Sequence, residues 1–314
     1  MSIDLPILPD RQNPDFIGQL INFGHYLEKS ARPGCKFDLS LWPNTLWQLI
    51  EKKMLSGLDL FVSTTVKESE VLMLQWYNSG IFIKTAEAVI GFDIVPLPRY
   101  YGWPDSAGLT ARIAAALDAL MVTHNHQDHF DSSLVEAVIR LKKPVLMHPA
   151  ATESGSAILQ ATDGAVFKIC GFSIKSHHAT HVWRNSMSEL PLTCFECRRE
   201  DSFRIIFCGD ADYTRGFPGV KPEPDALFIT WRNPGPRYED GHPNQTGTTL
   251  DAVNIVIKEL RPHRLILEHY AELDHIYRGF SASYEIAESL IKSIDLPTDI
   301  FFWGEIAYLK PPCK

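Results

Sequence analysis

The sequence lacks the signals of export and of membrane insertion. Residues 1–6 contain no basic start followed by an apolar core, so no signal peptide is predicted. No apolar run approaches the roughly 20 residues that a membrane-spanning helix needs. The cysteines are few and scattered, at Cys35, Cys170, Cys194, Cys197, Cys208 and Cys313. Such spacing fits reduced thiols better than a disulfide framework, and we therefore expect a cytoplasmic protein.

The sequence also lacks a positive net charge, internal repeats and low-complexity segments. Its 38 acidic and 30 basic residues give a formal net charge of −8. Phosphate backbones select basic surfaces, so nucleic acid is not the expected partner. A chain of 314 residues with 45% hydrophobic content can bury a large core in one or two domains. We expect a soluble protein that acts on a small molecule rather than at a membrane. A homo-oligomer is compatible with the sequence.

What the sequence does contain is a dense group of metal-ligating side chains. The apolar stretch Leu117–Val122, which predicts a buried strand, leads directly into this group. His124 and His126 point the same way in an extended segment, because strand side chains alternate with period two. Asp128 and His129 follow after a turn and can face a second ion. Imidazole and carboxylate together suit zinc, manganese or iron, so a metal site is favoured over a solvated histidine-rich loop.

Three later apolar runs are each followed by more candidate ligands. His177, His178 and His181 come after 165–176, Asp210 and Asp212 after 203–208, and Glu268 and His269 after 264–267. Ligands gathered from several strand ends onto one edge of a sheet are how α/β enzymes build their sites. The sequence therefore predicts one site assembled from distant segments.

These motifs resemble those of the metallo-β-lactamase superfamily of metal-dependent hydrolases. The matching residues are His124-x-His126-x-Asp128-His129, a later histidine, Gly209-Asp210 and His269. The segments 74–83 and 89–93 are similar to the opening hairpin of that fold. Within the superfamily, the chain is most similar to the branch of L-ascorbate 6-phosphate lactonase and N-acyl-phosphatidylethanolamine phospholipase D. The resemblance spans about residues 70 to 310 and implies an α/β fold, a four-layer αββα sandwich.

The resemblance further implies a binuclear centre that holds two divalent ions, Zn²⁺ or Mn²⁺. The implied ligands are His124, His126 and a third histidine for one ion, Asp128, His129 and His269 for the other, and Asp210 as the bridge. For the third histidine, the resemblance favours His181 over His178, because His181 falls where related chains place the ligand after a small-residue turn. Since His177 and His178 are adjacent, they face opposite ways in a strand, and only one of them could reach the site.

Such a centre would lower the pKa of a bound water, and the resulting hydroxide would attack a carbonyl or phosphorus atom. We therefore expect a hydrolase that cleaves a lactone, phosphodiester or related ester, with a small anionic substrate. Asp128 is a candidate proton shuttle. His242, in a loop rich in glycine and proline, is either a substrate contact or acid, or a solvated turn residue. Asp93 could orient a ligand imidazole, and Asp212 is interpreted as a supporting or turn residue.

Two other function classes compete with hydrolysis. The first is a mononuclear iron oxidoreductase or sulfur-handling enzyme of the same fold. Relatives with a redox di-iron centre usually carry glutamate where this chain has His126, which disfavours oxygen chemistry. The second is a catalytically silent binding scaffold. Silent relatives usually lose ligands, and here every ligand position is filled, so the sequence favours a hydrolase.

The chain divides into two predicted parts. Residues 1–65 form an N-terminal helical extension, with helices expected at Phe16–Lys29 and Leu46–Ser56. This part lies outside the resemblance and could cap the core, form a dimer contact or wall the substrate pocket. Residues 66–314 form the hydrolase domain, in which strands and helices alternate and Ile300–Leu309 closes the fold as a strand.

Overall fold

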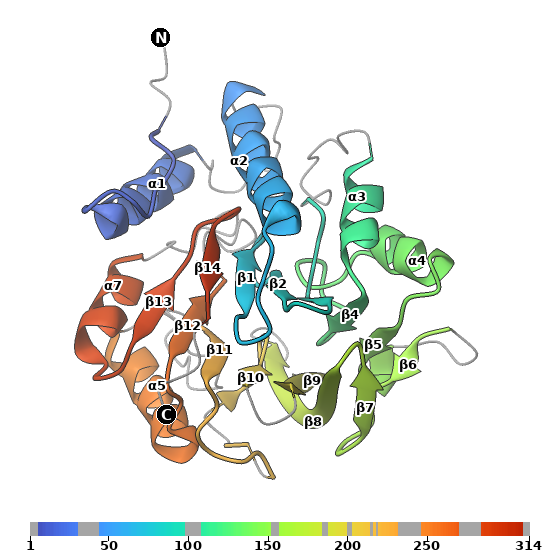
Figure 1. Cartoon of the computed structure of the whole chain (residues 1–314). Helices are drawn as coiled ribbons and strands as arrows, with labels where there is room; N and C mark the ends of the chain where they lie inside the picture. The colour runs from blue at the N-terminus through green and yellow to red at the C-terminus, as the bar shows by residue number, and fades with distance from the viewer. Residues whose placement is uncertain are drawn as a thin grey trace.

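The computed structural model describes residues 6–30, 44–97, 108–151, 157–183, 188–199, 203–213, 216–217, 219–231, 246–269 and 284–309. Within these residues the chain forms two seven-stranded sheets with helices on their outer faces (Figure 1). The first sheet has the order β14-β1-β2-β3-β4-β5-β6, and the second has the order β13-β12-β11-β10-β9-β8-β7. This architecture is the four-layer α/β sandwich expected from the sequence.

The strands are short except for two. The first sheet contains β1 (Leu72–Gln75), β2 (Ile81–Lys84), β3 (Val89–Phe92), β4 (Ala119–Val122), β5 (Val145–Met147), β6 (Leu159–Gln160) and β14 (Ile306–Tyr308). The second contains β7 (Val166–Ile169), β8 (Phe172–Trp183), β9 (Ser188–Arg199), β10 (Phe203–Phe207), β11 (Ala226–Thr230), β12 (Leu265–Glu268) and β13 (Thr298–Ile300). Because β8 and β9 pair along their whole length, they form a long antiparallel ribbon.

The helices are distributed over both sheets (Figure 1). They are α1 (Phe16–Ser30), α2 (Asn44–Ser63), α3 (Leu109–Ala116), α4 (Ser132–Arg140), α5 (Thr246–Leu260) and α7 (Tyr284–Ser293), with a short 3₁₀ helix at Pro149–Ala151. Helices α2 and α4 contact strands of the first sheet, and α7 contacts β13 of the second. None of the helices in the described segments is long and apolar enough to cross a membrane.

Strands buried on both faces explain the four layers. In β4, Ala119 and Met121 belong to the apolar cluster between the sheets, whereas Leu120 and Val122 belong to the cluster beneath the helices. Across the sandwich, the ring of Phe92 stacks on Phe207 with their centroids 4.8 Å apart. Strands with two buried faces have near-continuous apolar sequences, which is why the run before His124 predicts a strand.

The site depends on the half of each sheet in which the strands pair in parallel. Strands β3, β4, β5 and β6 pair in parallel with one another in the first sheet, and β10, β11, β12 and β13 do so in the second. The carboxyl ends of parallel strands meet at one edge, where loops can gather functional side chains. The candidate ligands follow β4, β10 and β12 at these edges.

Two expectations from the sequence are wrong. The segment Ile300–Leu309 is not one strand: β13 ends at Ile300 in the second sheet, and β14 joins the first sheet beside β1. A turn at Gly304, whose φ is +81°, redirects the chain between them. The segment His177–His181 does not follow a strand but lies within β8, because pairing with β9 continues as far as Trp183.

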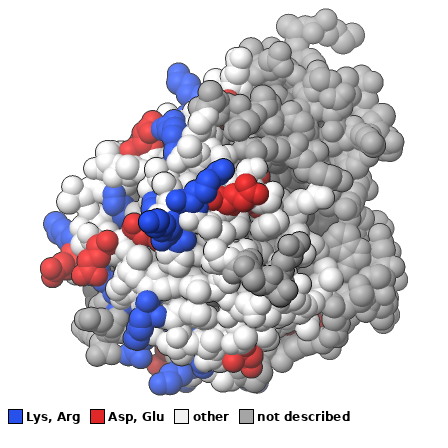
Figure 2. Space-filling model, turned by 90° about the vertical axis from the view of Figure 1, so that its right-hand side faces the viewer, with Lys and Arg blue, Asp and Glu red and all other residues white. Residues whose placement is uncertain are grey.

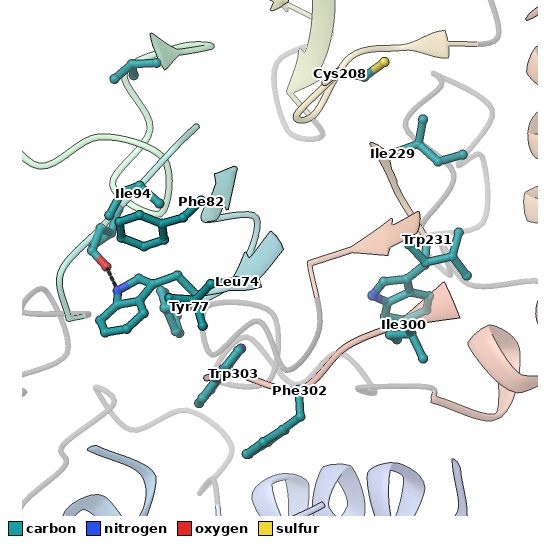
Figure 3. Packing of buried hydrophobic residues seen from close by; sticks show 14 of the residues in the cluster. Leu74, Tyr77, Phe82, Ile94, Cys208, Ile229, Trp231, Ile300, Phe302 and Trp303 are labelled. Carbon is teal, nitrogen blue, oxygen red and sulfur yellow. Dashed lines mark hydrogen bonds between the residues drawn. The ribbon is translucent and has the colours of Figure 1, made fainter. Parts of the chain in front are cut away.

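The N-terminal helices occur where the sequence predicts them, although α2 extends beyond Ser56 to Ser63. Phe23 of α1 packs edge-on against Phe302, with ring centroids 5.2 Å apart. Figure 3 shows Phe302 and Trp303 side by side, and Trp303 lies 5.0 Å from the ring of Tyr77. The α1 helix thus adds to one continuous apolar cluster with the first sheet, while the division at residue 65 stays a prediction.

Helix α2 packs closely against the turn before β14 at Gly57. We expect that a substitution by alanine at this position would not fit without a shift of the backbone. A Cβ atom there would lie 2.1 Å from the backbone oxygen of Gly304, far inside van der Waals contact. We expect Gly57→Ala to lower the free energy of unfolding by about 1–3 kcal/mol, as overpacking of a rigid contact usually does. Urea denaturation measures the change. Ser56→Ala, at the exposed neighbouring position, is the control, and equal stability of the two variants would contradict the prediction.

Candidate metal centre

Seven side chains predicted as ligands lie together at the edge of the sandwich. They form two adjacent clusters, His124, His126, His181 and Asp210 in one, and Asp128, His129 and His269 in the other. Within each cluster, one ligand-type atom of every residue lies within 4.8 Å of the others. The loop after β4 supplies four of the residues, while β8, the turn after β10 and the end of β12 supply one each. Both sheets therefore contribute donors to each cluster.

Asp210 lies between the two clusters. Its Oδ2 atom is 3.5 Å from Nε2 of His129 and 3.6 Å from Nε2 of His181, and its Oδ1 atom is 2.6 Å from Nε2 of His269. Oδ2 of Asp128 is also 3.5 Å from Nε2 of His129. Two donors that share a tetrahedral zinc ion at bond lengths near 2.1 Å lie about 3.4 Å apart. The three separations of 3.5–3.6 Å therefore fit donors that share an ion, whereas Asp210 and His269 are in direct contact at 2.6 Å, and Asp210 is suited to a bridging position.

The imidazole nitrogens also fit a metal. Nε2 of His124 and Nε2 of His129 are buried without a hydrogen bond. Their Nδ1 atoms do have partners, because Nδ1 of His124 is 2.9 Å from Oγ1 of Thr123 and Nδ1 of His129 is 2.7 Å from Oδ2 of Asp93. A hydrogen bond at Nδ1 fixes the tautomer that leaves the Nε2 lone pair for a ligand. A bound ion would satisfy both buried nitrogens.

Asp93 connects the two histidines. Besides its contact with His129, its Oδ1 accepts the backbone N–H of Thr123 at 2.7 Å, and its Oδ2 accepts the Thr123 hydroxyl at 2.7 Å. The sequence predicts an orienting role for Asp93, and the structure shows the contact. Gly209 allows the turn after β10 to approach this pair: its φ is +51°, and a Cβ atom would lie 2.8 Å from Oγ1 of Thr123.

The protein environment sets the charges of these groups in the absence of metal. Burial lowers the pKa of His124 well below its usual value and that of His126 to about 4, so both imidazoles are neutral and can act as ligands. Burial alone would lower the pKa of His129, but the carboxylates of Asp128 and Asp210 outweigh it and raise that pKa. Burial opposes ionisation of Asp210, yet neighbouring imidazoles hold its pKa well below the usual range. The carboxylate of Asp210 is therefore ionised.

Glu268, next to His269, is a carboxyl group of a different kind. It is fully buried, and neither of its carboxyl oxygens has a hydrogen bond. Burial, with a further contribution from Asp93, raises its pKa to about 8. Glu268 is therefore mostly protonated near neutral pH and adds little negative charge beside the clusters.

Other candidates from the sequence lie apart from the clusters or outside the described residues. His178 donates toward the backbone oxygen of Ala161 at 2.9 Å and packs on His148, so the structure places His181 and not His178 beside His124. His177 pairs with Glu196 at 2.9 Å, and Asp212 belongs to neither cluster. His242 falls outside the described residues.

Sequence reasoning missed two residues of the hairpin turn between β1 and β2. Nδ2 of Asn78 donates to Oδ2 of Asp128 at 2.8 Å, and Oγ of Ser79 lies 3.1 Å from Nδ1 of His129. The only signal in the sequence was a polar Asn-Ser pair in a turn between two buried strands. Because asparagine and serine are common in turns, the pair by itself does not indicate a role in the site.

Comparison with known proteins gives matches at the level of structure alone. No protein-family model and no curated protein matches the sequence. A metallo hydrolase from the hyperthermophilic archaeon Ignicoccus hospitalis is 15% identical, with a TM-score of 0.51, over 76% of this chain and 98% of that one. The metallo-β-lactamase fold protein YhfI from Bacillus subtilis is 15% identical, with a TM-score of 0.52, over 76% of this chain and 98% of that one.

A larger enzyme shares the same architecture. CmlA, a diiron β-hydroxylase from Streptomyces venezuelae, is 14% identical with a TM-score of 0.53, over 79% of this chain. This chain spans about half of that enzyme, with 55% of it covered. Identities this low establish the architecture and leave the chemistry to the site. The two sheets, their helices and these neighbours together show that the chain has the metallo-β-lactamase fold.

Proposed function

We propose that the protein is a binuclear metal-dependent hydrolase that cleaves a lactone, phosphodiester or related ester of a small anionic molecule. The observation that carries the proposal is the arrangement of two donor clusters about one shared carboxylate, Asp210. Four donors in one cluster, Asp210 among them, and three in the other suit two divalent ions side by side. The fold is one on which metallo hydrolases occur, as the Ignicoccus protein illustrates.

Zinc or manganese is the proposed metal. Three imidazoles in the first cluster favour zinc, while the carboxylates of Asp128 and Asp210 also suit manganese. When bound, two such ions supply a water of lowered pKa and polarise the carbonyl or phosphoryl group of the substrate. Asp210 would coordinate both ions, and the buried His129 and His269 would coordinate the second of them.

Asp128 is the residue best suited to transfer a proton. Its side chain is 18% exposed, whereas that of His129 is fully buried, and the other carboxylate of similar exposure, Asp210 at 16%, lies between the two clusters. A carboxylate at the border of the centre can exchange protons with solvent and with a leaving group, which buried donors cannot do. We assign Asp128 both as a ligand and as the proton shuttle. His242 stays a candidate substrate contact.

The charge balance of the site supports an anionic substrate. Two divalent ions and the carboxylates of Asp93, Asp128 and Asp210 leave about one positive charge, since the remaining donors are imidazoles. By contrast, the surface outside the centre carries both signs: Figure 2 shows blue and red side chains interspersed over the described part of one face. Attraction of an anion would therefore come from the centre itself rather than from a basic surface field.

Metal removal should abolish activity and destabilise the fold. Protein purified without chelator is expected to contain about two zinc or manganese ions per chain and to hydrolyse bis-p-nitrophenyl phosphate or a simple lactone. Dialysis against dipicolinate should remove both ions and the activity. It should also lower the free energy of unfolding by about 4 kcal/mol for each ion removed, relative to protein at a free metal concentration of 1,000 times the Kd of that ion. Elemental analysis, a substrate panel and urea denaturation measure these quantities.

Other outcomes of the metal-removal experiment would favour the iron oxidoreductase or the binding scaffold. Recovery of activity on adding back zinc or manganese, but not magnesium, separates metal loss from irreversible unfolding. One iron ion per chain with consumption of dioxygen would favour the mononuclear iron oxidoreductase, and the diiron β-hydroxylase CmlA shares this fold. Absence of both metal and turnover in the intact protein would favour a binding scaffold.

A further inference from the structure

The hairpin turn between β1 and β2 contacts the second donor cluster at two points. Nδ2 of Asn78 donates to Oδ2 of Asp128 at 2.8 Å, and Oγ of Ser79 is 3.1 Å from Nδ1 of His129. Asn78 and Ser79 are both completely buried. One turn therefore touches both a carboxylate and an imidazole of the same cluster, the one that also contains His269.

The backbone of this turn is held firmly. The buried side chain amide of Gln75 donates to the backbone oxygens of Trp76, Asn78 and Gly80, at 3.1, 2.8 and 3.3 Å. The Trp76 indole N–H donates to the loop after β3, at the backbone oxygen of Val95. A polar group on a backbone fixed in this way can place a neighbouring ligand accurately, because its own position varies little.

Asn78 itself has an unusual backbone. Its φ is +54°, in the left-handed region, which asparagine tolerates better than other residues with a side chain. Its Oδ1 atom is buried without a hydrogen bond. A hairpin turn accounts for this backbone conformation, but it does not account for the unsatisfied buried oxygen, which costs free energy. The contact that the amide does make is the one to Asp128.

That contact selects one oxygen of Asp128. The oxygen held by Asn78 is Oδ2, the same atom that lies 3.5 Å from Nε2 of His129. This separation is the one expected for two donors that share an ion. The amide can only donate through Nδ2, so it stabilises a carboxylate facing the cluster and opposes rotation of that oxygen toward solvent.

We propose that Asn78 is a positioning residue for the second metal position, acting through Asp128. This inference rests on the proposed binuclear function and deepens it. Ser79 supports the same position through His129. The hairpin turn thereby acts on the second metal position through Asp128 and His129, whereas the first position depends on His124, His126 and His181.

Two variants separate the amide from the backbone. Asn78→Gly keeps the left-handed backbone accessible and removes the donor. Asn78→Asp keeps the shape and tolerates the same φ, but it places an acceptor against Oδ2 of Asp128. Titration of metal-free protein with Co²⁺, followed by visible absorption and calorimetry, reports the two binding steps separately.

We expect both variants to weaken the second Co²⁺ step by about 10–100-fold, the usual effect of losing a group that orients a ligand. The first step should stay within about threefold of the wild-type value. Equal weakening of both steps would indicate a general structural role and overturn the proposal. Unchanged binding in both steps would also overturn it.

Two measurements keep this test independent of folding and of the proposed function. The melting temperature of each metal-free variant shows whether the fold is retained, and the first Co²⁺ step of the same sample provides an internal control. If the wild-type protein binds fewer than two ions, the proposed binuclear function fails before the variants are compared. If the wild type binds two ions and Asn78→Gly does so equally well, only the role of Asn78 is rejected.

Discussion

Replacing Asp210 with asparagine is expected to abolish hydrolysis. Its oxygens lie within 3.6 Å of imidazole nitrogens from both clusters, so in the proposed binuclear centre the carboxylate would neutralise two ions at once. Asparagine has nearly the same shape but no charge and only one oxygen to offer. Loss of a group that merely orients a ligand typically costs 10–100-fold, so kcat/KM should fall by at least about 100-fold here. Steady-state kinetics and elemental analysis measure the effect.

Asp212 offers a matched control two residues along the same turn. Its side chain is also buried, but it belongs to neither donor cluster. Asp212→Asn is expected to retain about two ions per chain, whereas Asp210→Asn is expected to lose at least one. If the two variants exchange these behaviours, Asp212 is the bridging residue and the assignment of Asp210 is wrong.

Replacing Asp93 with asparagine should have the second largest effect. The Asp93 carboxylate accepts three hydrogen bonds, from Nδ1 of His129 and from the backbone and hydroxyl of Thr123. An asparagine amide cannot accept all three, and it removes the anion that faces the buried His129. Breaking a buried charge pair usually costs about 3–5 kcal/mol, and we expect a loss of this size in the metal-free protein. Urea denaturation measures it.

Asp118 provides the control for Asp93. It also accepts a backbone N–H, that of Val89 at 2.8 Å, but it has no recorded contact with a histidine. Because asparagine can still accept this hydrogen bond, Asp118→Asn should cost no more than about 1 kcal/mol. Similar losses in the two variants would show that Asp93 contributes only an ordinary hydrogen bond and would leave the histidines without a dedicated orienting group.

The sequence predicts the parts of the centre that depend on local spacing. His124, His126, Asp128 and His129 stand within six positions of one another after a buried strand, and period-two geometry is enough to bring the first two together. The carboxyl-end rule then brings Asp210 and His269 to the same edge. The four-layer fold follows from the same apolar runs, because strands buried on both faces need helices outside them.

Features that depend on distant pairing could not be predicted. The length of β8 is set by its partner β9, and this pairing keeps His181 inside a strand rather than after one. The crossing from β13 to β14 depends on which sheet has a free edge beside β1. The contact of Asn78 with Asp128 joins residues 50 positions apart, and no periodicity in the sequence encodes it.

Substrate identity lies beyond both the ligand set and the fold. Neighbours of 14–15% identity include a metallo hydrolase and a diiron hydroxylase, so one architecture accommodates different chemistries. The loop with His242 falls outside the described residues, and specificity in such folds resides in loops. Hydrolysis of the substrate panel would therefore decide between the lactonase and phospholipase branches.

The return of β14 to the first sheet has a consequence for the order in which the protein matures. A chain emerges from the ribosome N-terminus first, so the donors at His124 to His129 are available long before His269 is made. The first sheet, in turn, is completed only when β14 pairs with β1. A nascent chain therefore has neither a closed first sheet nor a complete second donor cluster. In the proposed centre, metal binding at that cluster would therefore follow the synthesis of most of the polypeptide.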